Sequence, residues 1–267
     1  MKCHPLRVGH DLRELVNPAP PLREPVLLLA FEGWNDAGEA ASEAVDYFAQ
    51  ALQATPLAEL DPETYYDFTV NRPHVRLDAG VRRIEWRTFA LRHAEMLDGR
   101  QLVLGSGPEP HLRWRAFCDE VADFARRHRV RRALLLGAFL ADVVYSQPVR
   151  VTGFASDSGV AERLALEGSG YEGPTGIVGV LGERLRADGV EIVSLWAGLP
   201  HYIPASPNPR GALALVQKVT ACLDLPVDEE PLRAAAVEFE ERISALVAND
   251  PALSEYVRAL KKREFAQ

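Results

Sequence analysis

Five acidic or imidazole side chains follow apolar segments of the chain, and they have the clearest potential for chemistry. They are Glu32, Asp36, Glu109, Asp142 and His201. Carboxylates and imidazoles can transfer protons, and a group of them can hold a metal or a cationic substrate. A structural interpretation is also open, because Asp36 can cap a helix, Glu109 lies in a Pro-Glu-Pro turn and Asp142 can bond its local backbone.

Four short apolar runs bounded by Gly or Pro must position these side chains. They are Val26 to Phe31, Gln101 to Leu104, Ala133 to Leu140 and Glu191 to Trp196. Such runs are typical of buried strands, and between them lie helical patterns whose apolar residues share one face. This alternation predicts an α/β protein with a mostly parallel mixed sheet covered on both faces, which is a three-layer α/β/α fold. The carboxyl ends of parallel strands share one edge of the sheet, so the five side chains are predicted to gather there.

Residues 67–91 depart from this alternation. Phe68 to Val70, Val75 to Leu77 and Ile84 to Phe89 have the character of short strands joined by Asn-Arg-Pro and Asp-Ala-Gly turns. The segment therefore predicts an antiparallel excursion at the edge of the sheet.

The C-terminal segment has a purely helical pattern in two parts, separated at Asn249-Asp250-Pro251. Its apolar stripe comprises Leu232, Ala236, Phe239, Ile243 and Leu246, then Leu253, Val257 and Leu260. We expect an α/β domain over residues 1–227 and a helical hairpin over 228–267, packed on the same domain or on a neighbouring subunit. Because an apolar stripe needs a surface to cover it, the hairpin is a predicted site of self-association.

Composition limits the classes of function. The chain has 267 residues, of which 47% are hydrophobic and 25% charged, as expected of a globular protein. No apolar run approaches the roughly 20 residues that span a membrane, and charge interrupts the amino terminus where a secretory signal would be apolar, so we expect a cytoplasmic protein. The net charge of -8 disfavours a nucleic-acid partner. Cys3, Cys118 and Cys222 are too far apart for a zinc or redox motif.

The glycine-rich turns do not identify a cofactor. Gly168-Ser-Gly-Tyr-Glu-Gly173 matches the dinucleotide pattern, but it follows a helical pattern instead of a strand, which favours a turn into a helix that begins at Pro174. Phosphate-loop, nucleophile-elbow and zinc-helix motifs do not occur in the sequence. We therefore predict no cofactor, no metal and no catalytic residue from motifs.

Residues near the strand ends also suit a protein interface. Aromatic side chains beside Gly and Pro are common in interfaces, and four of them occur here. The candidate set for a ligand site or an interface is Glu32, Gly33, Trp34, Asp36, Glu109, Asp142, Tyr145, Tyr171, Gly173, Thr175, His201 and Tyr202.

Five segments, taken in order, carry a family resemblance. They are Phe31-Glu-Gly-Trp-Asn-Asp-Ala-Gly38, Gly105-Ser-Gly-Pro-Glu-Pro110, Gly137-Ala-Phe-Leu-Ala-Asp142, Tyr171-Glu-Gly-Pro-Thr-Gly-Ile177 and Trp196-Ala-Gly-Leu-Pro-His-Tyr202. Over about residues 24 to 220 the chain resembles the bacterial branch of the proteasome assembly chaperone 2 family. The resemblance implies a fold like that of the phosphorylase/hydrolase superfamily, homo-oligomers that include a trimer, and a role near proteasome assembly or regulation. The sequence ends in Phe265-Ala266-Gln267, with Ala266 where relatives that dock on the proteasome have tyrosine, so insertion of the tail into a proteasome pocket is not expected.

Two functional hypotheses follow. The first is a non-enzymatic, self-associating protein-binding module whose partners include proteasome subunits. The alternative is a small-molecule enzyme, hydrolase-like or ligase-like, with Glu32, Asp142 and His201 as acid, base or metal-binding groups at the strand ends. The two hypotheses differ in one structural requirement: only the enzyme needs these three side chains to share one reacting centre.

Overall fold

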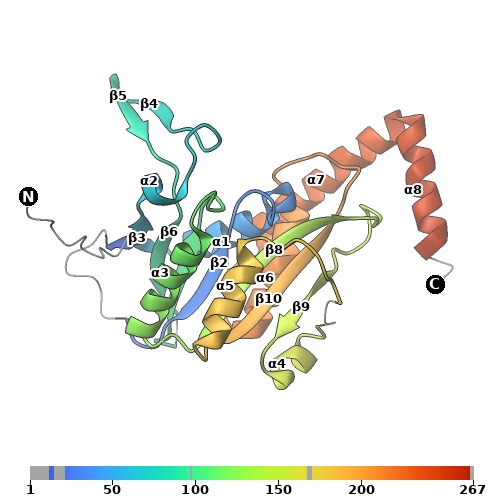
Figure 1. The fold of residues 1–267 in the computed structure, drawn as a ribbon. Helices are drawn as coiled ribbons and strands as arrows, with labels where there is room; N and C mark the ends of the chain where they lie inside the picture. Colours follow the sequence, from blue (N-terminus) through green and yellow to red (C-terminus); the bar gives the residue numbers. More distant parts are fainter. Residues whose placement is uncertain (1–11, 15–21, 97, 167–169, 265–267) are drawn as a thin grey trace, which may run out of the picture.

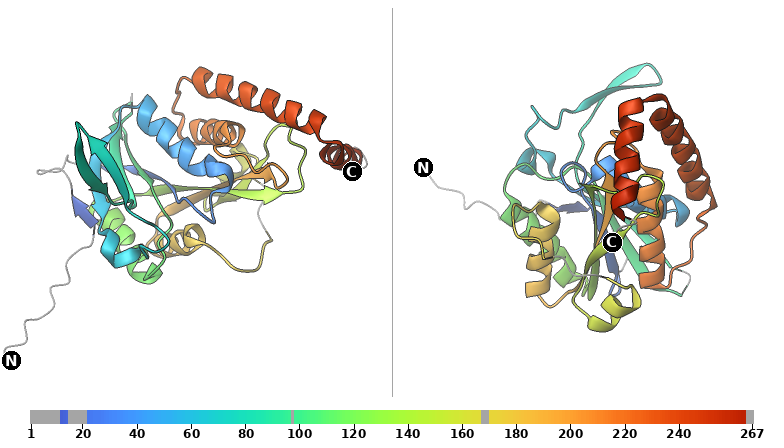
Figure 2. Two further views of the ribbon diagram at one scale, coloured as in Figure 1. Left: turned by 90° about the horizontal axis from the view of Figure 1, so that it is seen from above. Right: turned by 90° about the vertical axis from the view of Figure 1, so that its right-hand side faces the viewer.

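A computed structural model describes residues 12–14, 22–96, 98–166 and 170–264 (Figure 1). In this part of the chain, an eight-stranded sheet has the order β1-β3-β6-β7-β2-β8-β10-β9. The strands are β1 Leu12–Glu14, β2 Val26–Ala30, β3 Thr55–Leu60, β6 Ala90–Glu95, β7 Gln101–Ser106, β8 Arg132–Ala141, β9 Val151–Ala155 and β10 Glu191–Pro200. Helices cover both faces, so the predicted three-layer α/β/α fold with a mixed sheet is confirmed (Figure 2).

The four predicted central strands lie side by side and run in one direction. β2 pairs in parallel with β7 on one side and with β8 on the other, and β8 pairs in parallel with β10. Leu28 faces both Leu104 and Leu134 in this register. Apolar residues occupy nearly every position of these strands because both faces of the sheet are buried.

Two helical layers enclose the sheet. One layer contains α1 (Ala40–Ala51), α4 (Ser158–Arg163) and α6 (Pro209–Leu223), and the other contains α3 (Trp114–Arg127) and α5 (Ile177–Ala187). The predicted apolar faces point inward, as the buried Val45, Phe117 and Leu181 show. None of the helices in the described ranges is long and apolar enough to cross a membrane.

Antiparallel structure begins beyond β7, where β6, β3 and β1 complete one end of the sheet. Between α2 (Pro62–Tyr65) and β6, the strands β4 (His74–Asp78) and β5 (Val81–Glu85) form a separate antiparallel ribbon that projects from the body (Figure 1). The predicted strand at Phe68 to Val70 is wrong: this segment is a turn, because the Asp67 carboxylate accepts hydrogen bonds from the Thr69 amide at 2.8 Å and its hydroxyl at 2.7 Å. The predicted strand from Ile84 to Phe89 ends at Glu85.

The short turn η1 (Ala37–Glu39) lies directly before α1.

The C-terminal segment forms the helices α7 (Glu230–Asn249) and α8 (Pro251–Glu264). A cluster of their apolar residues packs on Val144 and Ile203, which follow β8 and β10 of the same chain. The cluster residues from α7 and α8 are Phe239, Ile243, Val247, Val257 and Leu260. These residues of the stripe are thus covered within one chain, which is one of the two placements that the sequence left open. Leu246 was wrongly placed in this stripe: it is 50% exposed, and Val247 is buried in its place.

Candidate functional site

The predicted edge of the sheet exists, but its side chains fall into two groups. In the first group, Glu32, Asp36 and Glu109, the two glutamates line one cavity, and in the second, Asp142 and His201, the aspartate lines another. β8 runs on to Ala141, whereas β2 ends at Ala30, so the loop after β2 lies beside the last part of β8. The Asn35 carbonyl accepts a hydrogen bond from the Ala138 amide at 2.8 Å. Asp36 also forms an isolated parallel bridge with Ala138.

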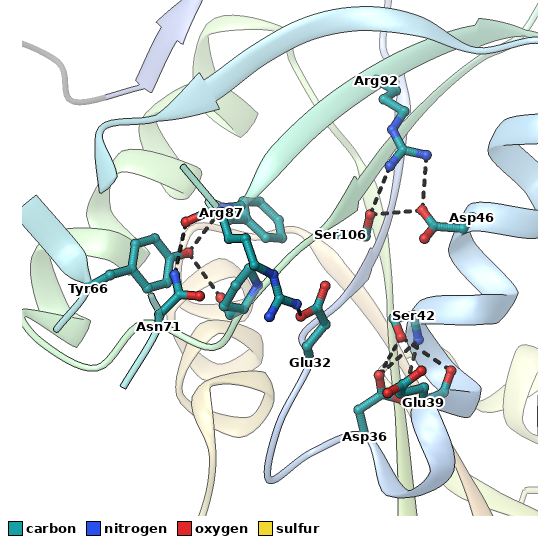
Figure 3. A network of polar contacts seen from close by, with 12 residues as sticks. Glu32, Asp36, Glu39, Ser42, Asp46, Tyr66, Asn71, Arg87, Arg92 and Ser106 are labelled. Carbon is teal, nitrogen blue, oxygen red and sulfur yellow. Dashed lines mark hydrogen bonds and ion pairs between the residues drawn. The ribbon is translucent and has the colours of Figure 1, made fainter. Parts of the chain in front are cut away.

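The first group surrounds a cavity of about 700 Å³ next to the base of the ribbon. Glu32 forms an ion pair with Arg87, which lies between β5 and β6 (Figure 3). The Asn71 side-chain amide donates to the Arg87 carbonyl at 2.9 Å, and the Tyr66 hydroxyl donates to the Pro108 carbonyl at 3.0 Å. These contacts fix the base of the ribbon to the strand ends.

Glu109 joins three segments of the chain. Its Oε1 atom accepts hydrogen bonds from the Ile177 amide and from the Asn35 side-chain amide, both at 2.8 Å. Ile177 is the first residue of α5, and a carboxylate at this position satisfies an amide that has no partner inside the helix. Glu109 therefore acts here as a helix cap and a link between loops.

Asp36 is buried at the start of α1. Its carboxylate accepts hydrogen bonds from the Ala41 amide at 2.7 Å and from the Ser42 hydroxyl at 2.5 Å. Burial raises the pKa of Asp36 to about 6, although these hydrogen bonds act in the opposite direction. The geometry matches the capping interpretation of this residue.

Glu43 lies on α1, near Asp36. The buried Oε2 atom of the Glu43 carboxylate has no hydrogen-bond partner in the structure. Burial, followed by the charges of Glu39 and Asp36, raises the pKa of Glu43 to about 7 from 4.5. Sequence patterns did not single out this residue, because its neighbours Asp36 and Glu39 cluster with it only once the turn η1 has folded.

The Glu43→Gln substitution is expected to reduce the pH dependence of stability. Glu43 holds its proton up to about pH 7 in the folded protein, whereas the unfolded group loses it near pH 4.5. Protonated Glu43 therefore makes its full contribution to the free energy of unfolding below pH 4.5, and this contribution is lost as the pH rises towards 7. After discounting for its partial exposure to solvent, we expect the variant to lose about 1 kcal/mol less unfolding free energy between pH 5 and pH 8 than the unmodified protein. Urea denaturation at the two pH values measures this difference. The exposed Glu63→Gln is the matched control, and an equal pH dependence in all three proteins would contradict the assignment.

The second group lies where α8 meets the strand ends. His201 Nε2 is 2.9 Å from Asp142 Oδ1 and 2.9 Å from the Tyr256 hydroxyl, which donates to Asp142 Oδ1 at 3.1 Å. Loss of water around the Tyr256 hydroxyl and its hydrogen bond to Asp142 raise the pKa of Tyr256. Two of the predicted acid-base groups are therefore neighbours, joined by a tyrosine from the C-terminal helix.

Beside this trio is a cavity of about 900 Å³ that α7 and α8 help to enclose, and Asp142 and Tyr145 line it. The Tyr145 amide donates to the Tyr202 hydroxyl at 3.0 Å, and that hydroxyl donates to the Val143 carbonyl at 3.0 Å. Tyr145 and Tyr202 thus serve to hold the loop after β8 beneath α7.

The other candidate residues lie on exposed turns. Gly33, with φ of 102°, and the exposed Trp34 form the tip of the loop after β2. Tyr171 is also exposed, and its hydroxyl donates to the Pro174 carbonyl at 3.0 Å. Gly173 lies beside the Tyr171 ring, and Thr175 is exposed just before α5. Gly168 of the dinucleotide-like motif, Cys3 and the Phe265-Ala266-Gln267 tail lie outside the described residues.

Sequence reasoning missed Arg87, Asn35 and Tyr256, each of which meets its partner across a long separation in the chain. Only the apolar stripe of α8 gave a signal, since it required that helix to pack on a surface. In the described ranges, no group of three or more His, Cys, Asp or Glu side chains could hold a metal ion.

Comparison with known proteins places this geometry in a family. The model of the PAC2 family matches residues 30–247. A PAC2 family protein from Streptomyces avermitilis is 44% identical, with 87% of this chain and 99% of that chain covered and a TM-score of 0.81. A Mycobacterium tuberculosis proteasome-assembly chaperone homologue is 41% identical over the same shares of the two chains, with a TM-score of 0.79.

More distant structures share the fold. PbaB of Pyrococcus furiosus, an archaeal proteasome activator, is 20% identical, with 89% of this chain and 99% of that chain covered and a TM-score of 0.70. No curated protein matches this chain. The family model spans both groups of strand-end residues and most of α7, and this chain therefore belongs to the PAC2 family.

Proposed function

We propose that this chain is a non-enzymatic protein-binding module that associates with itself, a trimer being one expected form, and acts in proteasome assembly or regulation with proteasome subunits as partners. The observation that carries the proposal is the similarity to a proteasome-assembly chaperone homologue. That protein is 41% identical, and the match covers 99% of its chain. The proposal keeps the chain in the cytoplasm, as the sequence predicted.

The strand-end geometry supports binding more than catalysis. Asp36 and Glu109 are engaged as helix caps, and Glu32 is engaged by Arg87. The enzyme alternative required Glu32, Asp142 and His201 in one centre. Asp142 and His201 are in contact, whereas Glu32 lines a different cavity from Asp142, and this separation supports the binding role more than a single reacting centre for all three.

Exposed large apolar side chains on several loops and on the ribbon also favour a binding role, because such surfaces mark interaction sites. The exposed aromatic and aliphatic residues include Trp34, Val70, Leu77, Val81, Ile84, Trp86, Phe139, Phe154 and Tyr171.

The test uses purified proteasome α and β subunits from the same source organism. When the chain is mixed with unassembled subunits, we expect it to co-elute with them in size-exclusion chromatography and to change the rate at which peptidase activity appears. Assembled proteasome mixed with the same amount of chain separates an effect on assembly from an effect on the finished particle. If the chain elutes alone and both rates are unchanged, the proteasome part of the proposal is wrong.

A further inference from the structure

The cavity of about 900 Å³ beside the trio of Asp142, His201 and Tyr256 lies between two parts of the chain. The loop after β8, the end of β10 and the start of α6 form one side, whereas Phe239 of α7 and Leu260 of α8 lie on the other (Figure 1). Cavities of roughly 300–1,000 Å³ hold small organic molecules in proteins. A ligand in this cavity would therefore contact the α/β domain and the C-terminal hairpin together.

Three arginines from different parts of the fold line this cavity. Arg150 directly precedes β9, Arg210 lies on α6 and Arg263 lies on α8. Among the described residues that line the cavity, the one carboxylate is Asp142, and the trio already engages it. Positive charge is thus in excess here, although the chain as a whole has a net charge of -8.

Arg210 is the most enclosed of the three, with a side chain that is 15% exposed. One of its guanidinium nitrogens donates to the Gln147 carbonyl at 2.7 Å, and its Nε atom lies 3.5 Å from a carboxylate oxygen of Glu240. That second distance is longer than a charge-assisted hydrogen bond, which is about 2.7–2.9 Å. A guanidinium has five N–H donors, so Arg210 keeps donors that a ligand oxygen can accept.

Arg150 and Arg263 are exposed at the two sides of the cavity. Within the described part of the chain, neither of them forms an ion pair. Arginine binds carboxylate and phosphate oxygens through its planar fork of donors. Unpaired guanidinium groups on both the body and the hairpin therefore favour an anionic ligand.

The rest of the cavity includes a wall of buried aliphatic and aromatic side chains. We call Val144, Leu199, Ile203, Phe239 and Leu260 the apolar wall. An inorganic ion would leave this wall uncovered, whereas a hydrocarbon body on the ligand would remove it from water. The combination of arginines and the apolar wall matches an organic anion.

We propose that this cavity binds a small organic anion that has a carboxylate or phosphate head and an apolar body. Arg150, Arg210 and Arg263 hold the head, and the body packs on the apolar wall. Because the ligand contacts both α8 and the α/β domain, its binding fastens the hairpin to the body. This inference goes beyond the proposed function and does not depend on it.

Isothermal titration calorimetry with matched probes tests the chemistry of the ligand. Decanoate and decyl phosphate are expected to bind at one site, and the tighter of the two identifies the preferred head. Hexanoate is expected to bind at least about tenfold more weakly than decanoate, because each buried CH₂ group contributes roughly a fourfold gain in affinity. Decyltrimethylammonium, which has the same chain and a cationic head, is expected not to bind.

The Arg150→Gln and Arg263→Gln variants test the head of the site. Each is expected to bind decanoate about tenfold more weakly, since it loses a hydrogen bond between charged groups. Arg258→Gln is the matched control: Arg258 is exposed on the same helix as Arg263 and is not among the residues that line the cavity, so this variant is expected to keep the affinity of the unmodified protein. Full affinity in both test variants would overturn the assignment of the head.

Hydrogen-deuterium exchange tests whether the ligand joins the two parts of the chain. Decanoate is expected to increase the protection of α8 amides in the unmodified protein, and bound decanoate that leaves this protection unchanged would overturn the fastening of the hairpin. If neither anionic probe binds, or if decyltrimethylammonium binds as tightly as decanoate, there is no anion site in this cavity. The subunit-mixing experiment decides the proposed function separately from any of these results.

Discussion

Replacement of Phe117 by alanine is expected to lower the free energy of unfolding by about 3–5 kcal/mol, as for other fully buried aromatic side chains. Phe117 lies on α3 and has no exposed surface. Its ring meets Phe31, Phe89 and Tyr65 edge-on, with centroids 5.7, 5.6 and 5.6 Å away. The substitution would remove apolar burial and these ring contacts together, and it would leave a cavity that the stacked Phe31 and Phe89 rings cannot fill.

This loss would extend to the first group of strand-end residues. Phe31 immediately precedes Glu32, and Phe89 follows Arg87 by two residues, so the aromatic cluster supports both sides of that ion pair. Urea denaturation measures the change in stability. The control is Tyr171→Ala, which removes an exposed aromatic ring and is expected to change the unfolding free energy by less than about 1 kcal/mol. Equal losses in the two variants would show that the cluster is not the centre of this core.

The central sheet could be predicted because its signal is local. Parallel strands buried on both faces require continuous apolar runs, and Val26 to Phe31 and Ala133 to Leu140 satisfy this requirement without reference to any partner. The shared edge followed from strand direction alone. The inward faces of α1, α3 and α5 likewise followed from helical spacing.

Features that depend on long-range packing could not be predicted in the same way. Leu246 and Val247 both fit a helical stripe that contains Ile243, and the surface formed by Val144 and Ile203 selects Val247. At Phe68 to Val70, the β-forming side chains favour a strand, but the Asp67 carboxylate accepts a hydrogen bond from the Thr69 amide and stabilises a turn instead. The division of the strand-end side chains into two groups depended on contacts across long separations in the chain, which bring Arg87 to Glu32 and Tyr256 to Asp142.

The apolar cluster between α7, α8 and the strand ends holds the C-terminal hairpin in place. Ile243→Asp is expected to destabilise the C-terminal hairpin by about 3 kcal/mol, because it places an unpaired carboxylate in an apolar cluster. Ile243 is buried against Phe239, Val247 and the strand-end residues Val144 and Ile203. We expect α8 and the end of α7 to separate from the sheet, which would also break the contact of Tyr256 with Asp142 and His201.

Hydrogen-deuterium exchange distinguishes this local release from global unfolding. Amides of α8 are expected to lose protection in Ile243→Asp, while those of β2, β8 and β10 keep it, because the two main cores lie on either side of the sheet and contain no residue of α8. Leu246→Asp is the matched control on the same helix, and its half-exposed position predicts a change within about 0.5 kcal/mol. The result also tests the proposed division of the chain into an α/β domain over residues 1–227 and a hairpin over 228–267. If the sheet amides exchange together with those of α8, the hairpin unfolds with the sheet as one cooperative unit, and the proposed boundary has no energetic meaning.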